Sequence, residues 1–157
     1  HHRDRFLDVT SQMRFHFGEV LISAVVRAVV IVALAIPLEA VIVFEILLQL
    51  GTMFHHSNLR VAPRLERALA RVVVTPSIHW VHHHRVRADT DSNYSTVFAW
   101  WDRLFASRSP TARTPAMDIG VEGRPELPLL GLLLLPFKGS DPFIPKRGLT
   151  PISRKGV

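Results

Sequence analysis

The most prominent pattern in the chain is a long apolar stretch over residues 20 to 54. As one straight helix it would extend on the order of 50 Å, well beyond the roughly 30 Å of a bilayer's hydrocarbon core. Pro37 lies near its middle, and proline breaks helices. The pattern therefore predicts two helices, over residues 20–36 and 38–54, each roughly 25 Å long and near the short end of the spanning range. We expect a transmembrane hairpin over residues 20–54.

Charged residues inside and around this stretch bear on the topology. Arg27, Glu39 and Glu45 interrupt it and leave open a buried helical pair in a soluble domain. Arginines flank it on both sides, and positive residues favour the cytoplasmic side of a membrane, so both ends are predicted there. These arginines are Arg3, Arg5 and Arg14 before the stretch, and Arg60, Arg64, Arg67 and Arg71 after it.

The rest of the chain predicts shorter helical elements. Residues 63–74 alternate apolar and basic positions at helical spacing, which is typical either of a helix lying in the membrane interface or of an ordinary surface helix. Residues 127–137 are apolar but too few to span a bilayer. Residues 138–157 are rich in proline, glycine and basic residues and predict a flexible tail. The expected fold class is all-α, a fragment of a helical membrane bundle.

Composition narrows the partners and the chemistry. The 157 residues are 48% hydrophobic, yet carry 19 Lys+Arg against 13 Asp+Glu, for a net charge of +6. No nucleic-acid-binding motif gathers these basic residues, so anionic lipid headgroups fit them better than nucleic acid does. The absence of cysteine excludes disulfides and thiolate metal sites. Any metal in this chain must therefore be held by imidazoles and carboxylates.

Nine histidines gather in clusters along the chain. Thr75 can cap a helix that begins at Pro76, which sets His79, His82 and His83 on one helical face. His84 falls outside that face. Neutral imidazole suits iron, zinc, copper and nickel alike, so the ligand type does not name the metal.

The other histidines flank the predicted hairpin. His16 precedes it and His55-His56 follow it, so a hairpin returns these histidines to one side of the membrane, together with residues 79–83. Other interpretations stay open: His16 as a packed or hydrogen-bonded histidine, residues 82–84 as a surface loop, and His1-His2 as the remnant of a purification tag.

Several separate segments together resemble the fatty acid hydroxylase/sterol desaturase superfamily, the membrane-bound histidine-box oxygenases. The HxxHH over residues 79–83 is followed by Asp91-Ser92-Asn93-Tyr94 and by Trp101-Asp102-Arg103-Leu104-Phe105, as in that family. Further upstream, His1-His2-Arg3-Asp4 resembles the end of its middle histidine box, Arg14 to Glu19 its Arg-Phe-His-Pro-x-Glu segment, and Phe54 to Leu59 its Phe-x-His-Ser-Asn turn. Ile119-Gly120 and residues 131–137 are similar to its tail. The resemblance covers roughly residues 1–137, which we take as one domain, with residues 63–105 as interfacial and metal-site helices.

The resemblance implies an integral membrane oxidoreductase of lipid biosynthesis that hydroxylates or desaturates a lipid with O2. Its di-iron centre, which zinc can replace on purification, would lie on the cytoplasmic side in a histidine-rich helical cap, with electrons from cytochrome b5 or a ferredoxin-type donor protein. The implied metal ligands are His1, His2, His56, His79, His82 and His83, followed by His16 and His55. The groups expected to orient these imidazoles are Asp4, Asp91, Asn93 and Asp102. No catalytic residue beyond the metal centre is implied.

One departure from the family pattern concerns the first histidine box. That HxxxH and the leading histidine of the middle box would precede His1, so we expect the 157 residues alone to lack the complete site. Two alternatives remain: a histidine-liganded zinc hydrolase, with Glu19 or an aspartate as general base, and a non-catalytic membrane interaction module. The pattern identifies neither the substrate nor the choice between hydroxylation and desaturation.

Overall fold

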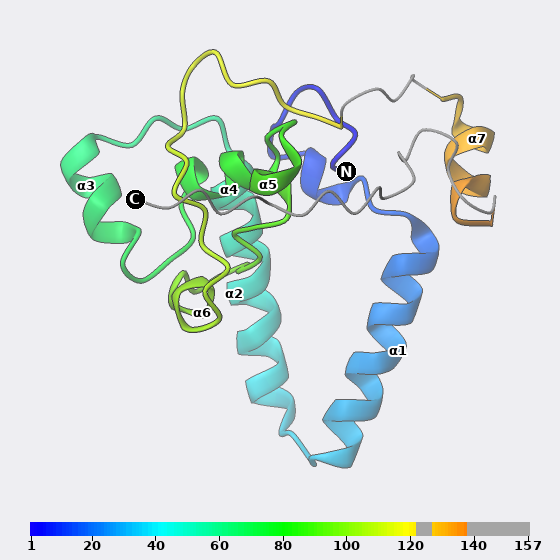
Figure 1. Cartoon of the computed structure of the whole chain (residues 1–157). Coiled ribbons are helices and arrows are strands. Elements are labelled where there is room, and N and C mark those ends of the chain that lie inside the picture. The colour runs from blue at the N-terminus through cyan, green and yellow to red at the C-terminus, as the bar shows by residue number, and fades with distance from the viewer. Residues whose placement is uncertain (122–126, 138–157) are drawn as a thin grey trace, which may run out of the picture. The chain divides into compact units, whose positions relative to one another are not determined.

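The computed structural model describes residues 1–121 and 127–137, which belong to two compact units, residues 1–122 and 123–157. The described residues form helices and no strands, which confirms the all-α prediction for them. The first unit contains η1 (Ser11–Met13), α1 (Phe17–Ala33), α2 (Leu38–His56), α3 (Pro63–Leu69), α4 (Pro76–His82), α5 (Arg87–Thr90) and α6 (Trp100–Leu104) (Figure 1). In the second unit, α7 (Leu129–Leu134) is followed by η2 (Leu135–Phe137). The predicted flexible tail, residues 138–157, lies outside the described residues.

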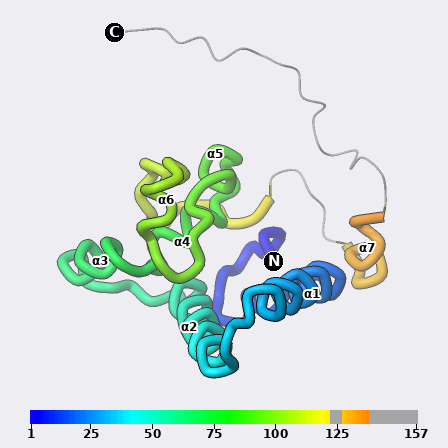
Figure 2. Tube along the Cα trace, turned by 90° about the horizontal axis from the view of Figure 1, so that it is seen from below, coloured from blue at the N-terminus to red at the C-terminus, as the bar shows by residue number. Residues whose placement is uncertain are grey.

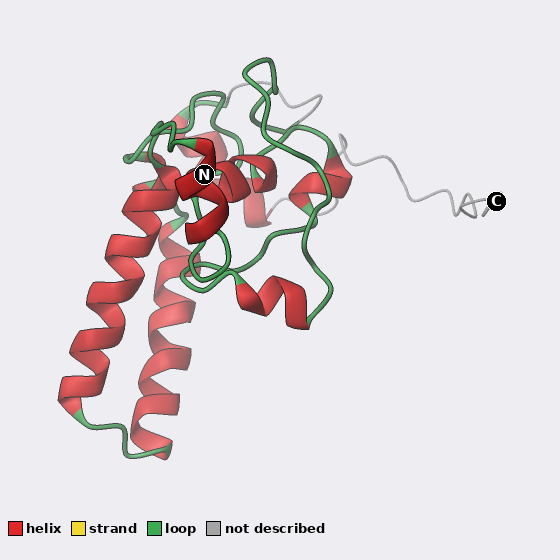
Figure 3. Cartoon of the chain, turned by 90° about the vertical axis from the view of Figure 1, so that its left-hand side faces the viewer, coloured by secondary structure: helices red, strands yellow, loops and turns green. Residues whose placement is uncertain are grey.

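The two long apolar helices, α1 and α2, are joined by residues 34–37 and run in opposite directions (Figures 1 and 3). Ala35 turns the chain with a φ of 48°, in the left-handed region. Pro37 then occupies the N-cap of α2, where its missing N–H costs no helical hydrogen bond. The N-terminal end of α1 and the C-terminal end of α2 both lie at the part of the molecule that carries the N-terminal segment and α4 (Figure 1).

Among the described helices, α2 is the one long and apolar enough to cross a membrane, with 19 residues. Only 6% of its apolar window is buried within the chain. Helix α1 has 17 residues, none of them buried. Length and composition thus support one span, and a transmembrane hairpin made of both helices stays a prediction.

An ion pair links the two long helices. Arg27 of α1 donates a hydrogen bond to the carboxylate of Glu45 of α2. Two of the three charges that interrupt the apolar stretch therefore compensate each other. A paired arginine and glutamate are far less costly in an apolar environment than two separate charges.

The buried interior of the first unit is mostly polar. Leu7, Val74, Val81 and Ala99 are each 1% exposed and form the small apolar part. The buried polar or charged side chains are Ser11, His55, His56, Ser57, Thr75, His79, His83, Asp89, Ser92, Asn93, Ser95 and Asp102. Buried polar groups need hydrogen-bond partners or a ligand. Among the buried polar residues, the histidines could bind a metal ion.

The helix predicted over residues 63–74 is shorter in the structure, because α3 ends at Leu69. The chain then turns and becomes extended, where Val74 N–H donates to the Val97 carbonyl and Ala99 N–H donates to the Val72 carbonyl. Residues 72–74 are consecutive valines, whose branched side chains favour extended backbone over helix. The helical prediction for residues 70–74 is therefore wrong.

Candidate metal centre

Helix α4 supplies three of the histidines, as the sequence spacing predicts. It begins at Pro76 and places His79 and His82 in one turn, with His83 as its C-cap. Thr75 lies at the N-cap position, but its hydroxyl donates to the Glu66 carboxylate and makes no cap hydrogen bond. The short helix is therefore anchored to α3 through Thr75.

Two further segments bring histidines to α4. His55 and His56 form the last turn of α2 and are 1% and 2% exposed. The N-terminal segment, which lies between α1 and α4 (Figures 1 and 2), places His2 against α4. The ring centroid of His2 is 4.4 Å from that of His83 and 4.6 Å from that of His82.

Seven histidines thus form one continuous histidine cluster, in which each ring lies near at least two others. The closest rings are those of His55 and His79, with centroids 3.9 Å apart, and His1 lies 5.0 Å from His83. The members of the histidine cluster are His1, His2, His55, His56, His79, His82 and His83. All seven are among the predicted ligands.

The ring nitrogens at the centre of the histidine cluster converge. The Nε2 atom of His79 lies 3.1 Å from Nε2 of His56 and 3.0 Å from Nε2 of His83. Nitrogens that share a metal about 2.1 Å away lie roughly 3.0–3.4 Å apart in octahedral or tetrahedral geometry. Two groups have ligand atoms within 4.8 Å of one another: His1, His56 and His83, and His55, His56 and His79. Both groups contain His56, whose Nδ1 already contacts the Thr52 carbonyl oxygen, so its Nε2 can serve one metal at a time. Either group could hold a metal ion.

Several buried ring nitrogens of the histidine cluster lack hydrogen-bond partners. The Nδ1 atoms of His2, His55, His79 and His83 are buried with no hydrogen-bond partner within the described residues. An unpaired buried polar atom costs roughly 1–3 kcal/mol. A neutral imidazole binds a metal through one nitrogen, so a metal at the converging Nε2 atoms of His79 and His83 would not relieve this cost at Nδ1. Support for metal ligation therefore comes from the converging Nε2 atoms.

The electrostatics keep these imidazoles neutral. Burial first, and then the neighbouring His82 and His56, lower the pKa of His2 from 6.5 to about 4. Burial likewise places the pKa of His79 well below its ordinary value, with His55 and His83 adding to the effect. The pKa of His83 is also lowered, first by burial and then by His2. A neutral imidazole has the lone pair that a metal requires.

Backbone carbonyls orient several of the rings. The Nδ1 atom of His82 lies 2.6 Å from the Ser92 carbonyl oxygen, and Nδ1 of His56 lies 2.9 Å from the Thr52 carbonyl oxygen. The backbone of Thr96 also lies close to the His55 ring. A ring whose Nδ1–H donates to a carbonyl presents Nε2 as the free ligand atom. Sequence analysis missed these partners because every residue has a carbonyl, so no residue type marks them.

The four side chains predicted to orient imidazoles make other hydrogen bonds in the structure. Asp4 accepts from Arg14 at 2.7 Å, and Asp91 accepts from Arg87 at 2.9 Å. Asn93 donates to the Ile78 carbonyl at 3.2 Å. Their role toward the imidazoles stays a prediction.

Asp102, the fourth of these, organises the segment that follows Asn93. Its carboxylate accepts hydrogen bonds from Tyr94 N–H at 2.8 Å, Ser95 N–H at 3.1 Å and the Ser107 hydroxyl at 2.7 Å. The side chain is 3% exposed. Asp102 therefore fixes residues 94–95, immediately before Thr96, whose backbone meets His55.

The two remaining histidines are placed differently. His16 is the N-cap of α1, where its Nδ1 accepts from Gly18 N–H at 3.1 Å, and its role as a ligand stays a prediction. His84, which falls outside the predicted ligand face, pairs through Nδ1 with Asp89 at 2.7 Å. Asp89 is buried and was not singled out by sequence analysis.

The described residues thus combine an apolar helix of membrane-spanning length with a histidine cluster that could hold a metal. Residues 1–107 match the model of the family described as fatty acid hydroxylase, and the chain belongs to that family. It is also similar to the ornithine lipid hydroxylase OlsE of Rhizobium tropici, with 28% identity over 151 residues that cover 94% of this chain. The chain spans 44% of that relative's length. No solved structure shows a significant match to the chain.

Proposed function

We propose that the protein is a membrane-bound, non-haem di-iron oxygenase that hydroxylates or desaturates a lipid. The observation that carries the proposal is the buried histidine cluster, in which Nε2 of His79 lies 3.1 Å from Nε2 of His56 and 3.0 Å from Nε2 of His83. Membership of the fatty acid hydroxylase family supports the lipid and the oxidative chemistry. The similar relative is named for the hydroxylation of an ornithine lipid, which further supports a membrane lipid as the substrate class.

In this proposal, the histidine cluster holds two iron ions, and His16 is a further candidate ligand. The metal pair, when bound, would supply the activation of O2 and the cleavage of an unactivated C–H bond. Electrons would come from a cytochrome b5 or ferredoxin-type donor protein.

The protein's own groups prepare the site in three ways. Burial keeps the imidazoles unprotonated, as the lowered pKa values of His2 and His79 indicate. The carbonyls of Thr52 and Ser92 hold His56 and His82 in fixed orientations. The enclosure of His79 and His83, which are 6% and 1% exposed, limits the access of bulk water.

The metal centre is proposed to face the cytoplasm. Arginines before α1 and after α2 would keep both ends of the hairpin on that side, following the preference of positive residues. The histidine cluster lies at those same ends, because His55 and His56 close α2.

The test uses the intact protein in detergent or lipid nanodiscs, with its metal content and its turnover of a lipid under O2 and a reductant measured together. His79→Ala is expected to lose iron and turnover while the protein stays folded and membrane-bound. His84→Ala is the matched control, because His84 pairs with Asp89 outside the histidine cluster. Bound zinc with hydrolytic activity would overturn the proposal in favour of a hydrolase. Undiminished function in His79→Ala would overturn it in favour of a non-catalytic membrane module.

A further inference from the structure

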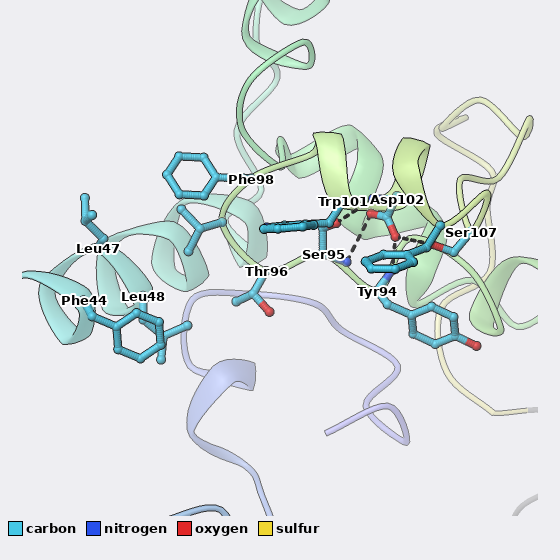
Figure 4. Close-up of a pocket in the computed structure, with 12 residues that line it drawn as sticks. Phe44, Leu47, Leu48, Tyr94, Ser95, Thr96, Phe98, Trp101, Asp102 and Ser107 are labelled. Carbon is cyan, nitrogen blue, oxygen red and sulfur yellow. Dashed lines mark hydrogen bonds between the residues drawn. The ribbon is translucent and has the colours of Figure 1, made fainter. Parts of the chain in front are cut away.

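An apolar groove of about 690 Å³ lies beside the histidine cluster (Figure 4). One wall is the face of α2 that carries Phe44, Leu47 and Leu48, which are spaced to lie on one side of a helix. Phe98, Trp101 of α6 and Phe105, the C-cap of α6, line the groove as well. Figure 4 shows the α2 side chains on one side and Trp101 with Asp102 on the other, with Thr96 between them.

The groove has the chemistry of a hydrocarbon site. Its side chains are predominantly aromatic and aliphatic, and Asp102 is the charged residue among those that line it. Both Asp102 oxygens already accept hydrogen bonds from Tyr94 N–H, Ser95 N–H and the Ser107 hydroxyl. Hydrogen bonds within the protein thus already occupy the buried carboxylate. Among the described residues that line it, the groove offers no free charged group that would bind a charged ligand.

The environment of the groove favours a lipid chain over a soluble ligand. Its α2 wall belongs to the helix that could span a membrane, and Phe44 and Leu47 are 50% and 45% exposed. Across the groove, Trp101 and Phe105 are 47% and 73% exposed. Figure 1 places α6 further toward the turn between α1 and α2 than α4. If α2 spans a bilayer, the groove is therefore continuous with hydrocarbon.

The inner end of the groove reaches the histidine cluster. Thr96 lines the groove, and its backbone lies close to the His55 ring. Tyr94, which also lines it, has its ring centroid 5.8 Å from that of His82. Gly51 allows residues 96–97 to approach α2 closely, since a Cβ there would lie 3.2 Å from Val97 Cγ2 and 3.6 Å from the Thr96 carbonyl oxygen.

We propose that this groove binds one hydrocarbon chain of the lipid substrate and guides it along α2 from the bilayer to the histidine cluster. The inference rests on the proposed function and adds the binding residues. Leu48, which is half-buried, lines the α2 wall of the groove together with Phe44. In this proposal, the length of chain between Leu48 and the histidine cluster selects the carbon that is presented for oxidation.

The test compares two tryptophan substitutions in the intact protein. Leu48→Trp fills the groove, whereas Ile46→Trp adds the same bulk about 200° around the helix, away from the groove. The first measurement uses a membrane lipid with a photoreactive diazirine in its acyl chain, and the labelled residues are mapped by mass spectrometry. It needs neither iron nor turnover.

Labelling is expected at Phe44, Trp101 and Phe105, with a loss of about tenfold in Leu48→Trp and little change in Ile46→Trp. Labelling spread evenly around α2, or equal in both variants, would overturn the groove as a chain site. A second measurement follows lipid oxidation by mass spectrometry. Leu48→Trp is expected to keep its metal content and to shift the oxidised position or the preferred chain length.

The outcomes separate the groove from the chemistry. Turnover with an unchanged product distribution in Leu48→Trp would refute the groove's role and leave the oxygenase proposal standing. Specific groove labelling in a protein that binds no iron and oxidises no lipid would support chain binding and refute the oxygenase proposal.

Discussion

Replacing Asp102 with alanine should destabilise the fold by about 3–5 kcal/mol. The change leaves Tyr94 N–H, Ser95 N–H and the Ser107 hydroxyl without the acceptor that they have now. Each hydrogen bond to a charged acceptor contributes roughly 1.5–3 kcal/mol, so a simple sum over three gives about 4.5–9 kcal/mol. The expected loss is smaller than this sum, because removing Asp102 also removes a buried charge and admits water to the donors.

The assay is denaturant unfolding of the purified protein in detergent, followed by circular dichroism. Asp91→Ala is the matched control, since its carboxylate forms an exposed ion pair with Arg87 within one helical turn. Such pairs contribute about 0.3–0.5 kcal/mol. A loss below about 1 kcal/mol in Asp102→Ala, or equal losses in both variants, would refute the reasoning that the buried hydrogen bonds of Asp102 hold residues 94–107 in place.

The remaining predictions concern the histidine cluster and its support. His79→Ala should lower the affinity for added Fe²⁺ or Zn²⁺ by at least about tenfold, measured by titration against a chelator, whereas His84→Ala should not. Gly51→Ala should displace the Val97 side chain, because the added Cβ would lie 3.2 Å from Val97 Cγ2, while the Thr96 carbonyl oxygen at 3.6 Å stays in ordinary contact. A small loss of stability with unchanged metal affinity is expected, and a large loss of affinity would contradict this reasoning. In the metal-free protein, the free energy of unfolding should fall as the pH drops from 6.5 towards about 4. In that range the unfolded chain takes up a proton at His2 that the folded chain excludes, so a flat profile would show that His2 is not buried in solution.

Much of the local helical structure could be predicted from the sequence because its signals are local. Pro37 precedes α2. Pro76 begins α4, and the spacing of His79 and His83 then places them one helical turn apart. The end of α3 depends on tertiary contacts as well as on the valines at residues 72–74. Residues 70–74 have acceptable helical periodicity, but their pairing with residues 97–99 satisfies the backbone in an extended conformation.

The candidate metal centre could likewise be predicted only in part. The ligand candidates could be found because imidazole is a distinctive side chain and its spacing follows helical geometry. The partners that orient the rings could not, since the Thr52 and Ser92 carbonyls belong to the backbone. The hydrogen bonds of Asp102 to Tyr94 and Ser95 were missed because they depend on how a loop closes rather than on a motif.

The histidine cluster draws its members from chain segments far apart: residues 1–2, 55–56 and 79–83. A metal held by His1, His56 and His83 would therefore act as a cross-link that closes two long loops. Closing such loops costs chain entropy. The bonds to the metal offset this cost only when all the segments that carry ligands are in place. A bound metal would then indicate that these three segments have folded against one another. A chain that has not acquired metal would lack the bonds that hold residues 1–2 against α2 and α4.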